Sequence, residues 1–247
     1  ISDVTGDAPA DIASGPCAAD YSTYLDALNI LSKYRLGPDA IPASVLNHLK
    51  QGVAGDRPET LKDIDLVDAQ VANHVIATAY KSLEAAADYV RSQGYEPIVL
   101  GDTITGEAQE VGISQAKLVR EHLAKDKTDK PLALISGGEC TVTIPAGVKG
   151  RGGRCSEYLL SLFAATQDLP AIAGLAADTD GIDGSEKNAG AWFTGDTRKA
   201  SQVQGISPEP FLKTHDCYGF FAELGALVET GPTLTNVNDF RIILLNK

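Results

Sequence analysis

The amino-acid sequence predicts an α/β fold, in which a largely parallel sheet is flanked by helices in Rossmann-like layers. Three observations support this prediction. Apolar runs of strand length alternate with segments of helical periodicity between residues 71 and 177, a pattern typical of parallel strands joined by helices. Glycine-rich turns follow two of the apolar runs. Apolar residues make up 43% of the 247 residues and charged residues 22%, so the chain can bury an ordinary globular core.

The first part of the chain, residues 1–68, is predicted to be an incomplete N-terminal α/β portion that contributes mainly helices. A helix is expected over residues 21–34, because apolar side chains recur on one side of it and a Gly-Pro stop signal follows. A shorter helix is expected after Pro42. Residues 52–68 are polar and contain glycine and proline, so we place the domain boundary after residue 68.

The second domain is predicted to cover residues 69–247. Its expected elements are strand 71–78, helix 82–93, strand 97–100, helix 107–124, strand 132–136, helix 156–165, strand 171–177, helix 211–224 and strand 241–245. In parallel sheets ligands collect at the carboxyl ends of the strands. The turns after residues 135 and 177 are therefore the candidate binding regions.

Charge and composition exclude several classes of protein. The formal net charge is −12 and the pI is about 4.7, so nucleic acid and anionic membranes would be repelled. The chain has no run of 18 apolar residues and no signal peptide, and its four cysteines lack the spacing of a zinc site or a disulfide framework. We therefore expect a cytoplasmic protein that acts on a small molecule. Because the chain begins without Met, in what reads as the end of a strand, we also expect a fragment.

The stretch from Ser136 to Glu157 is the strongest candidate for a ligand site. A strand ends there at a glycine pair, and a glycine-rich loop leads into a helix. This arrangement brings backbone amides and a helix N-terminus to an anion. The predicted cradle for phosphate or carboxylate consists of Gly137, Gly138, Lys149, Gly150, Gly152 and Gly153, with Arg154 beside them.

The glycine-rich loop matches neither of the two commonest phosphate fingerprints, the P-loop and the dinucleotide-binding loop. A solvated hairpin loop whose basic residues only add solubility therefore stays open as the alternative.

A second candidate site consists of Asp178, Asp180 and Asp183, which lie close together among glycines after strand 171–177. Oxygen ligands of this type suit Mg²⁺ or Ca²⁺. Alternatively one carboxylate is a general base for a substrate hydroxyl, or the segment is a polar turn without chemistry. The four histidines show no metal-binding spacing and are expected to be surface or helix residues without a catalytic role.

Five motifs occur in order along the chain. They are Ser2–Asp7 with Ile12–Pro16, Ser136–Glu139 with Thr141–Thr143, Gly150–Arg154 with Glu157, Thr179–Gly184, and Thr230–Asp239. Together they resemble the class II glycerate 2-kinases, which carry the MOFRL domain. Some members of that family are named hydroxypyruvate reductase in tartrate utilisation.

The resemblance implies transfer of the γ-phosphoryl group of ATP, with Mg²⁺, to the 2-hydroxyl of D-glycerate, giving 2-phosphoglycerate in glyoxylate and tartrate metabolism. It implies that residues 1–68 are the remnant of a first domain and that residues 69–247 are the MOFRL-type domain. The missing N-terminal half of the same protein would then be a partner of this chain. A homodimer of the protein is also compatible with the resemblance.

The resemblance also implies roles for particular residues. Arg154 matches the essential arginine of the family and would neutralise charge on the transferring phosphoryl group or the substrate carboxylate. Asp180 would accept the hydroxyl proton or hold Mg²⁺, with Asp183 as a second metal ligand. The glycines of the cradle, together with Lys149, would bind the nucleotide.

Two alternatives to a kinase stay open. One is NAD(P)H-dependent reduction of hydroxypyruvate, which ranks lower because no dinucleotide fingerprint follows any predicted strand. The other is a folded fragment without catalytic activity.

Overall fold

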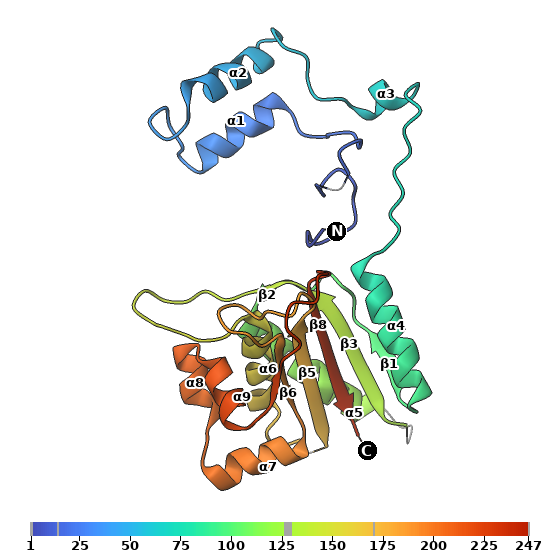
Figure 1. The fold of residues 1–247 in the computed structure, drawn as a ribbon, viewed down its shortest axis with the longest axis vertical. Helices are drawn as coiled ribbons and strands as arrows, with labels where there is room; N and C mark the ends of the chain where they lie inside the picture. Colours follow the sequence, from blue (N-terminus) through green and yellow to red (C-terminus); the bar gives the residue numbers. More distant parts are fainter. Residues whose placement is uncertain (1, 14, 126–129, 170, 247) are drawn as a thin grey trace. The chain divides into compact units, whose positions relative to one another are not determined.

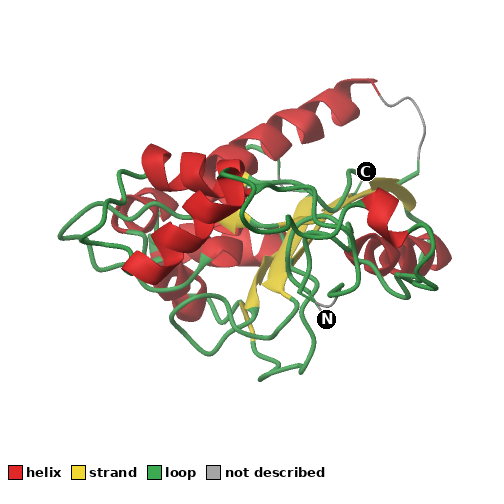
Figure 2. Ribbon diagram, turned by 90° about the horizontal axis from the view of Figure 1, so that it is seen from above, coloured by secondary structure: helices red, strands yellow, loops and turns green. Residues whose placement is uncertain are grey.

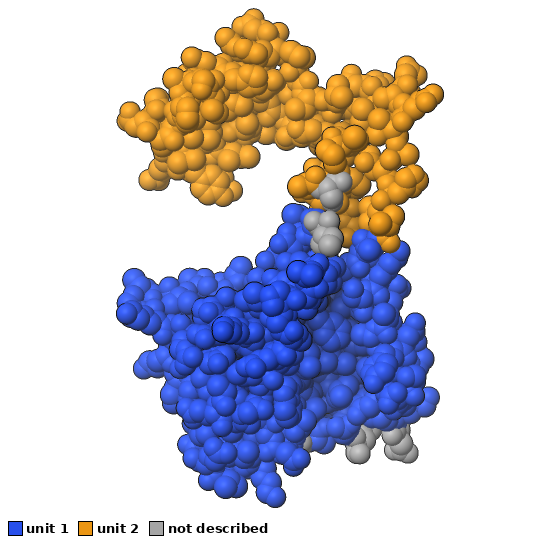
Figure 3. Space-filling model, viewed as in Figure 1, with its two compact units in different colours: residues 1–6, 77–247 blue, residues 7–76 orange. Residues whose placement is uncertain are grey.

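The computed structural model divides the chain into two compact units, which have different colours in Figure 3. One unit consists of residues 7–76, and the other of residues 1–6 together with residues 77–247. The structure describes residues 2–13, 15–125, 130–169 and 171–246.

The smaller unit contains the helices α1 (Tyr24–Lys33), α2 (Ala43–Val53) and α3 (Asp63–Leu66). Helix α1 begins with a capping box, in which the side chains of Thr23 and Asp26 each accept a hydrogen bond from the backbone of the other. Helices α1 and α2 approach closely because Gly52 has no side chain, and a Cβ there would lie 2.1 Å from the ring of Tyr24. Both of the helices predicted for this part of the chain are confirmed.

Among the described residues, the larger unit is built on a six-stranded sheet with the order β1-β3-β8-β5-β6-β7 (Figure 1). The strands are β1 (Glu96–Val99), β3 (Leu132–Gly138), β5 (Ile172–Asp178), β6 (Gly190–Phe193), β7 (Leu227–Val228) and β8 (Asp239–Leu245). A separate parallel pair joins β2 (Gly106–Glu107) to β4 (Cys140–Thr141). Helices pack on both faces of the large sheet, so the predicted α/β fold is confirmed.

The pairing within the sheet differs from the expected largely parallel arrangement. Strand β1 pairs parallel with β3, but the other neighbouring pairs described in this six-stranded sheet are antiparallel. Strand β8 forms two of these antiparallel pairs, because it inserts between β3 and β5 and runs opposite to both, and β6 forms the other two with β5 and β7. Strands β1, β3 and β5 still share one direction, as the alternation of strands and helices predicts. Sequence patterns identify the faces of a strand but not its neighbours, so the insertion of β8 was not predictable from them.

Alternate residues of β3 divide the core into two clusters. Leu132 and Leu134 belong to the cluster formed with α5 (Ala108–Lys125), α6 (Arg154–Ala165), α8 (Pro208–Thr214) and α9 (Cys217–Glu223). Ala133 and Ile135 belong to the cluster formed with α4 (Ala79–Ser92) on the other face. Helix α5 is the long helix that leads into the grey segment in Figure 2. Every residue of α6 from Cys155 to Phe163 is buried, so this helix is enclosed by the unit.

Several segments differ from the sequence prediction. Residues 71–78 form no strand, and Val71 and Val75 are exposed, because no described strand lies beside them to complete a ladder. The helix predicted over residues 211–224 is broken into α8 and α9 at His215, which adopts the left-handed conformation with φ of 54°. The sequence prediction also lacks the short elements α3, β2, β4, β6 and β7 and the helix α7 (Gly195–Gln204).

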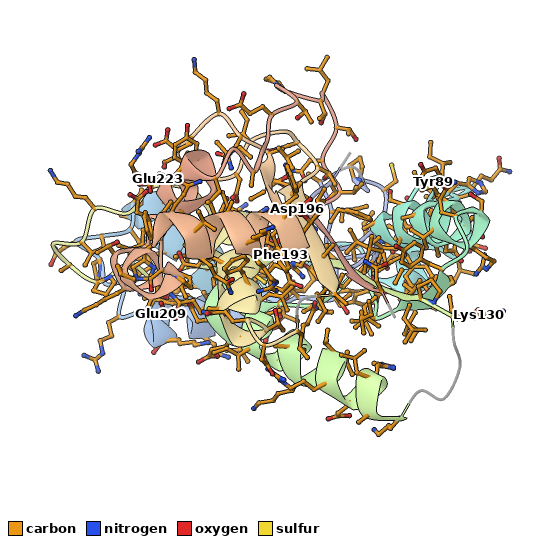
Figure 4. The ribbon with its side chains drawn as sticks, turned by 90° about the horizontal axis from the view of Figure 1, so that it is seen from below. Tyr89, Lys130, Phe193, Asp196, Glu209 and Glu223 are labelled. Atoms are coloured by element: carbon orange, nitrogen blue, oxygen red, sulfur yellow. The ribbon has the colours of Figure 1, made fainter. Side chains whose placement is uncertain are left out.

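Two labelled side chains in Figure 4 show the contrast between the core and the surface. Phe193 of β6 lies among other side chains with 1% exposure, and its ring meets that of Phe163 edge to face at 5.3 Å. Tyr89 on the outer side of α4 is 67% exposed. Across the described ranges, the helices are too short or too polar to cross a membrane.

Candidate active site

Arg154 is the first residue of α6, and three carboxylates surround its guanidinium group. Its Nε donates to Oδ1 of Asp239 at 2.7 Å, and its Nη2 donates to Oδ2 of Asp178 at 2.7 Å. Nη1 lies 3.3 Å from Oε1 of Glu139. The arginine side chain is 26% exposed, so part of it remains accessible.

The sheet explains why these carboxylates meet. Glu139 follows the end of β3, and Asp178 ends β5. Asp239 begins β8 and is paired in register with Gly138 on one side and Asp178 on the other. Because β8 is antiparallel to both neighbours, its first residue lies beside the carboxyl ends of β3 and β5. The predicted location of the site, at the carboxyl ends of strands, is therefore where Arg154 lies.

Asp239 is shared by two arginines. Its side chain has no exposed surface, and Oδ2 accepts from Nη2 of Arg241 at 2.5 Å. Arg241 is itself fully buried and donates through Nη1 to the carbonyl oxygen of Gly137 at 3.1 Å. Burial lowers the pKa of Arg154, but the charges of Asp239 and Asp178 outweigh this effect and hold the pKa above its usual value.

Asp178 is buried beside Arg154 and has an unusual protonation behaviour. Burial raises the pKa of Asp178 to about 6, against the opposing effects of the Asp180 amide and of Arg154. A carboxyl group with this pKa changes its charge close to neutral pH, and that change alters the number of charges around Arg154.

A pocket of about 210 Å³ opens beside Arg154. Its lining comes from the segment after β3, the glycine-rich loop, the start of α6 and the joint between α8 and α9. The lining residues are Cys140, Val142, Ile144, Gly150, Gly152, Gly153, Arg154, Glu157, Gly184 and His215. Three of the predicted cradle glycines and Arg154 are thus brought together in one pocket.

Two lining residues, Glu157 and His215, form a hydrogen-bonded pair. Oε1 of Glu157 lies 2.7 Å from Nδ1 of His215 and also accepts from Nε2 of Gln109 at 2.7 Å. The side chains of Glu157 and His215 are 5% and 13% exposed. No catalytic or ligand role was expected for His215 from the sequence, and the structure places it at the pocket.

The glycines of the loop allow close contact with the protein itself. A Cβ at Gly150 would lie 2.4 Å from the carbonyl oxygen of His215, and a Cβ at Gly153 would lie 2.4 Å from Oδ1 of Asp183. Gly152 has φ of 112°, a conformation that favours glycine. The loop is therefore packed against the rest of the unit, and the alternative of a solvated hairpin loop does not describe it.

Asp183 occupies the position at which an anion was expected. Its Oδ1 accepts from the amide of Cys155 at 2.9 Å, and its Oδ2 accepts from the amide of Ser156 at 2.8 Å. The hydroxyl of Ser156 also donates to Oδ2, and the residue is fully buried. Asp183 thus satisfies the N-terminal amides of α6 as a helix cap. These contacts are those of a structural carboxylate, unlike the metal ligand that the resemblance implied.

Asp180, Lys149, Gly137 and Gly138 lie outside the set of residues that line the pocket. Oδ1 of Asp180 accepts from the amide of Ile182 at 2.7 Å, which stabilises its own turn. Lys149 is exposed. Gly138, with φ of 110°, packs against Ile104, where a Cβ would lie 2.3 Å from the carbonyl oxygen. Gly138 is therefore explained by close packing against the segment before β2.

The arrangement of carboxylates limits how a metal ion could bind. Within the described ranges, no group of three or more His, Cys, Asp or Glu side chains is placed to hold one. Mg²⁺ in phosphoryl-transfer sites is commonly held by only one or two carboxylates, with waters and phosphates as the other ligands. Asp180, which is partly exposed and follows Asp178, fits that smaller requirement.

Comparison with known proteins finds two matched families and relatives that are named glycerate kinase or hydroxypyruvate reductase. Residues 132–239 match the MOFRL family, and residues 1–50 match a domain of unknown function, DUF4147. A putative hydroxypyruvate reductase of Agrobacterium vitis is 43% identical over 99% of this chain and 61% of its own length. A glycerate 2-kinase of Pyrococcus horikoshii is 39% identical over 99% of this chain and 54% of its own length.

A solved structure of a glycerate kinase has the same fold over the matched region. The crystal structure of glycerate kinase from Thermotoga maritima matches 99% of this chain and 55% of its own chain, with 35% identity and a TM-score of 0.82. The chain therefore spans between 54% and 61% of the length of these curated relatives. The two matched families and the shared fold therefore support the resemblance to the class II glycerate kinases that the order of the motifs indicates.

Proposed function

We propose that the protein at the full length of its relatives phosphorylates D-glycerate at the 2-hydroxyl, using ATP and Mg²⁺, and gives 2-phosphoglycerate. The observation that carries this proposal is Arg154, fixed by carboxylates from three strand ends at the rim of a small pocket. The names of the Pyrococcus and Thermotoga relatives support it.

The proposed role of Arg154 is to stabilise negative charge on the transferring phosphoryl group. Nε and one N–H of Nη2 are used by Asp239 and Asp178, while Nη1 has a longer contact with Glu139 at 3.3 Å. Nη1 therefore has N–H groups that can donate to a ligand without release of the two short bonds. An arginine held in this way loses little freedom on binding, and such residues act strongly on transferring phosphoryl groups.

We propose Asp180 as the carboxylate that holds Mg²⁺, with Asp178 beside it. Bound Mg²⁺ would neutralise charge on the phosphates of the nucleotide. Asp183 is left out of this proposed metal site because its oxygens accept from Cys155 and Ser156.

Reduction of hydroxypyruvate is the second candidate, because the Agrobacterium relative carries that name. The geometry favours the kinase. A dinucleotide-binding turn leads directly into a helix, whereas Gly137 and Gly138 lead into β4. The amides of Cys155 and Ser156 at the start of α6 are taken by Asp183, so they are not available to a pyrophosphate.

The test is a pair of assays on the protein at the full length of its relatives and on this chain alone. We expect the longer protein to release ADP from ATP when D-glycerate is added, and not to oxidise NADH when hydroxypyruvate is added. We expect little turnover by this chain alone, since it spans little more than half of each relative. NADH oxidation without ADP release would overturn the kinase proposal.

A further inference from the structure

We propose that the 210 Å³ pocket takes the small hydroxy acid and not the nucleotide, and that Nε2 of His215 accepts a hydrogen bond from a hydroxyl group of that acid. The proposal rests on the proposed kinase function for the identity of the acid. It assigns to His215 the recognition of the substrate hydroxyl.

The size of the pocket indicates a small ligand. Pockets for drug-sized molecules typically have volumes of roughly 300–1,000 Å³. The pocket beside Arg154, at about 210 Å³, is smaller than that range. A three-carbon acid suits this volume, whereas a nucleoside triphosphate, which is itself of drug size or larger, would need additional surface.

The His215 ring is held from two sides. Its backbone lies in the left-handed conformation between α8 and α9, and its carbonyl oxygen accepts from the amide of Arg151 at 2.9 Å. Its Nδ1 lies 2.7 Å from Oε1 of Glu157. Glu157 is in turn fixed by Gln109, so the ring has a defined orientation, and both Glu157 and His215 belong to the lining of the pocket.

The hydrogen bond to Glu157 determines what the other ring nitrogen can do. A carboxylate only accepts hydrogen bonds, so Nδ1 of His215 is the donor. In the neutral ring Nε2 then carries a lone pair and acts as an acceptor. No residue in the described part of the chain donates a hydrogen bond to this nitrogen.

The pocket therefore combines two complementary groups. Arg154 supplies N–H donors for a carboxylate or phosphoryl oxygen, and His215 supplies an acceptor for a hydroxyl. A hydroxy acid carries both of the matching groups on one small molecule. A plain carboxylic acid would leave Nε2 without a partner, and a site built to bond a hydroxyl discriminates against analogues that lack it.

The competing explanation is that the pair of Glu157 and His215 only joins α6 to the segment between α8 and α9. That structural role would not depend on the hydroxyl groups of a ligand. A comparison of ligands with and without hydroxyl groups separates the two explanations.

The experiment is a titration of this chain, without nucleotide, with D-glycerate and with propanoate, which has the same carbon chain but no hydroxyl. D-lactate and 3-hydroxypropanoate identify which hydroxyl is recognised. The proteins are the wild type, His215→Ala and, as a control, His74→Ala, because His74 is exposed in the other unit. We expect the wild type and His74→Ala to bind D-glycerate about tenfold more tightly than propanoate, and His215→Ala to bind both acids equally.

A second measurement on the wild type avoids any effect of the substitution on folding. The ¹⁵N resonance of His215 Nε2 should shift on addition of D-glycerate and not on addition of propanoate. Equal binding of the two acids by the wild type, absence of glycerate binding, or discrimination that survives in His215→Ala would overturn the inference. The ADP-release assay reports on the kinase proposal separately, because binding of the acid is measured here without ATP.

Discussion

Nε of Arg154 lies 2.7 Å from Oδ1 of Asp239, and the second oxygen of that carboxylate is held by Arg241 at 2.5 Å. One buried carboxylate thus joins an accessible arginine to a fully buried one. Because Arg241 also bonds the carbonyl oxygen of Gly137 in β3, the position of Arg154 is linked to the centre of the sheet.

The substitution Asp239→Asn should destabilise the larger unit strongly. It removes a buried charge that pairs with Arg241, and breaking such a pair from one side costs about 3–5 kcal/mol. Denaturant unfolding of this chain measures the loss. The matched control is Asp168→Asn, which breaks the exposed pair with Arg120 and should change stability little. Equal effects of the two substitutions would mean that Asp239 is not held as described.

Replacement of Arg154 should affect catalysis more than folding. In the protein at the full length of its relatives, Arg154→Ala should lower the turnover rate by on the order of 10³ or more, as for other arginines that act on a transferring phosphoryl group. Arg154→Lys should restore little, because a lysine has no planar group to reach both Asp239 and Asp178. Arg151→Ala, in the same loop but paired with Glu186, serves as the control and should stay within a few-fold of the wild type. An Arg154→Ala variant with nearly full activity would remove this residue from the mechanism.

The substitution Gly153→Ala should destabilise the chain by about 2 kcal/mol or more, because the new Cβ would meet Asp183, which is held by α6 and cannot move without loss of the cap. Gly37→Ala is the control, since a Cβ added there would have nothing within 4 Å and the φ of Gly37 is not in the left-handed region. Thermal unfolding of both variants checks the prediction. A stable Gly153→Ala protein would contradict the close packing of the loop.

The charge of Asp178 should make stability depend on pH. Its pKa is about 6 in the folded chain and has an ordinary value of 3.8, so the folded state binds more protons between these two values. The stabilising contribution is therefore complete below about pH 3.8 and is lost as the pH rises through about 6. The free energy of unfolding of the wild type, minus that of Asp178→Asn, should fall by roughly 1–3 kcal/mol between about pH 4 and pH 7. A difference that rises with pH would show that the charge of Arg154 affects the pKa of Asp178 more strongly than burial does.

Local patterns in the sequence predicted the elements that depend on local chemistry. The apolar spacing of α4, α5 and α6, and the runs that become β1, β3, β5 and β8, all appear where expected within a few residues. The glycine-rich loop and Arg154 were also found from sequence, because glycine and a basic residue before a helix have a direct physical meaning.

The rest of the site depends on contacts between distant parts of the chain. Asp178, Asp180 and Asp183 were grouped in the prediction because they are close in sequence. Gly181 turns the backbone between Asp180 and Asp183 with φ of 96°, and Gly184 turns it after Asp183 with φ of 75°. The three carboxylates therefore reach different partners. Likewise His215 meets Glu157 only after α8 and α9 have packed against α6.

The position of β8 has a consequence for the rate of folding. Leu245 pairs with both Leu132 and Ile172, so β3 and β5 cannot become connected until a strand from far along the chain has been captured between them. Contacts of such long sequence separation form slowly, since the closure of the large loop must precede the gain from pairing. Asp239 arrives with this strand, and Arg154 acquires its short bond in the same event. We therefore expect refolding experiments to show helix formation first, and the hydrogen bond between Arg154 and Asp239 only in the slowest main phase.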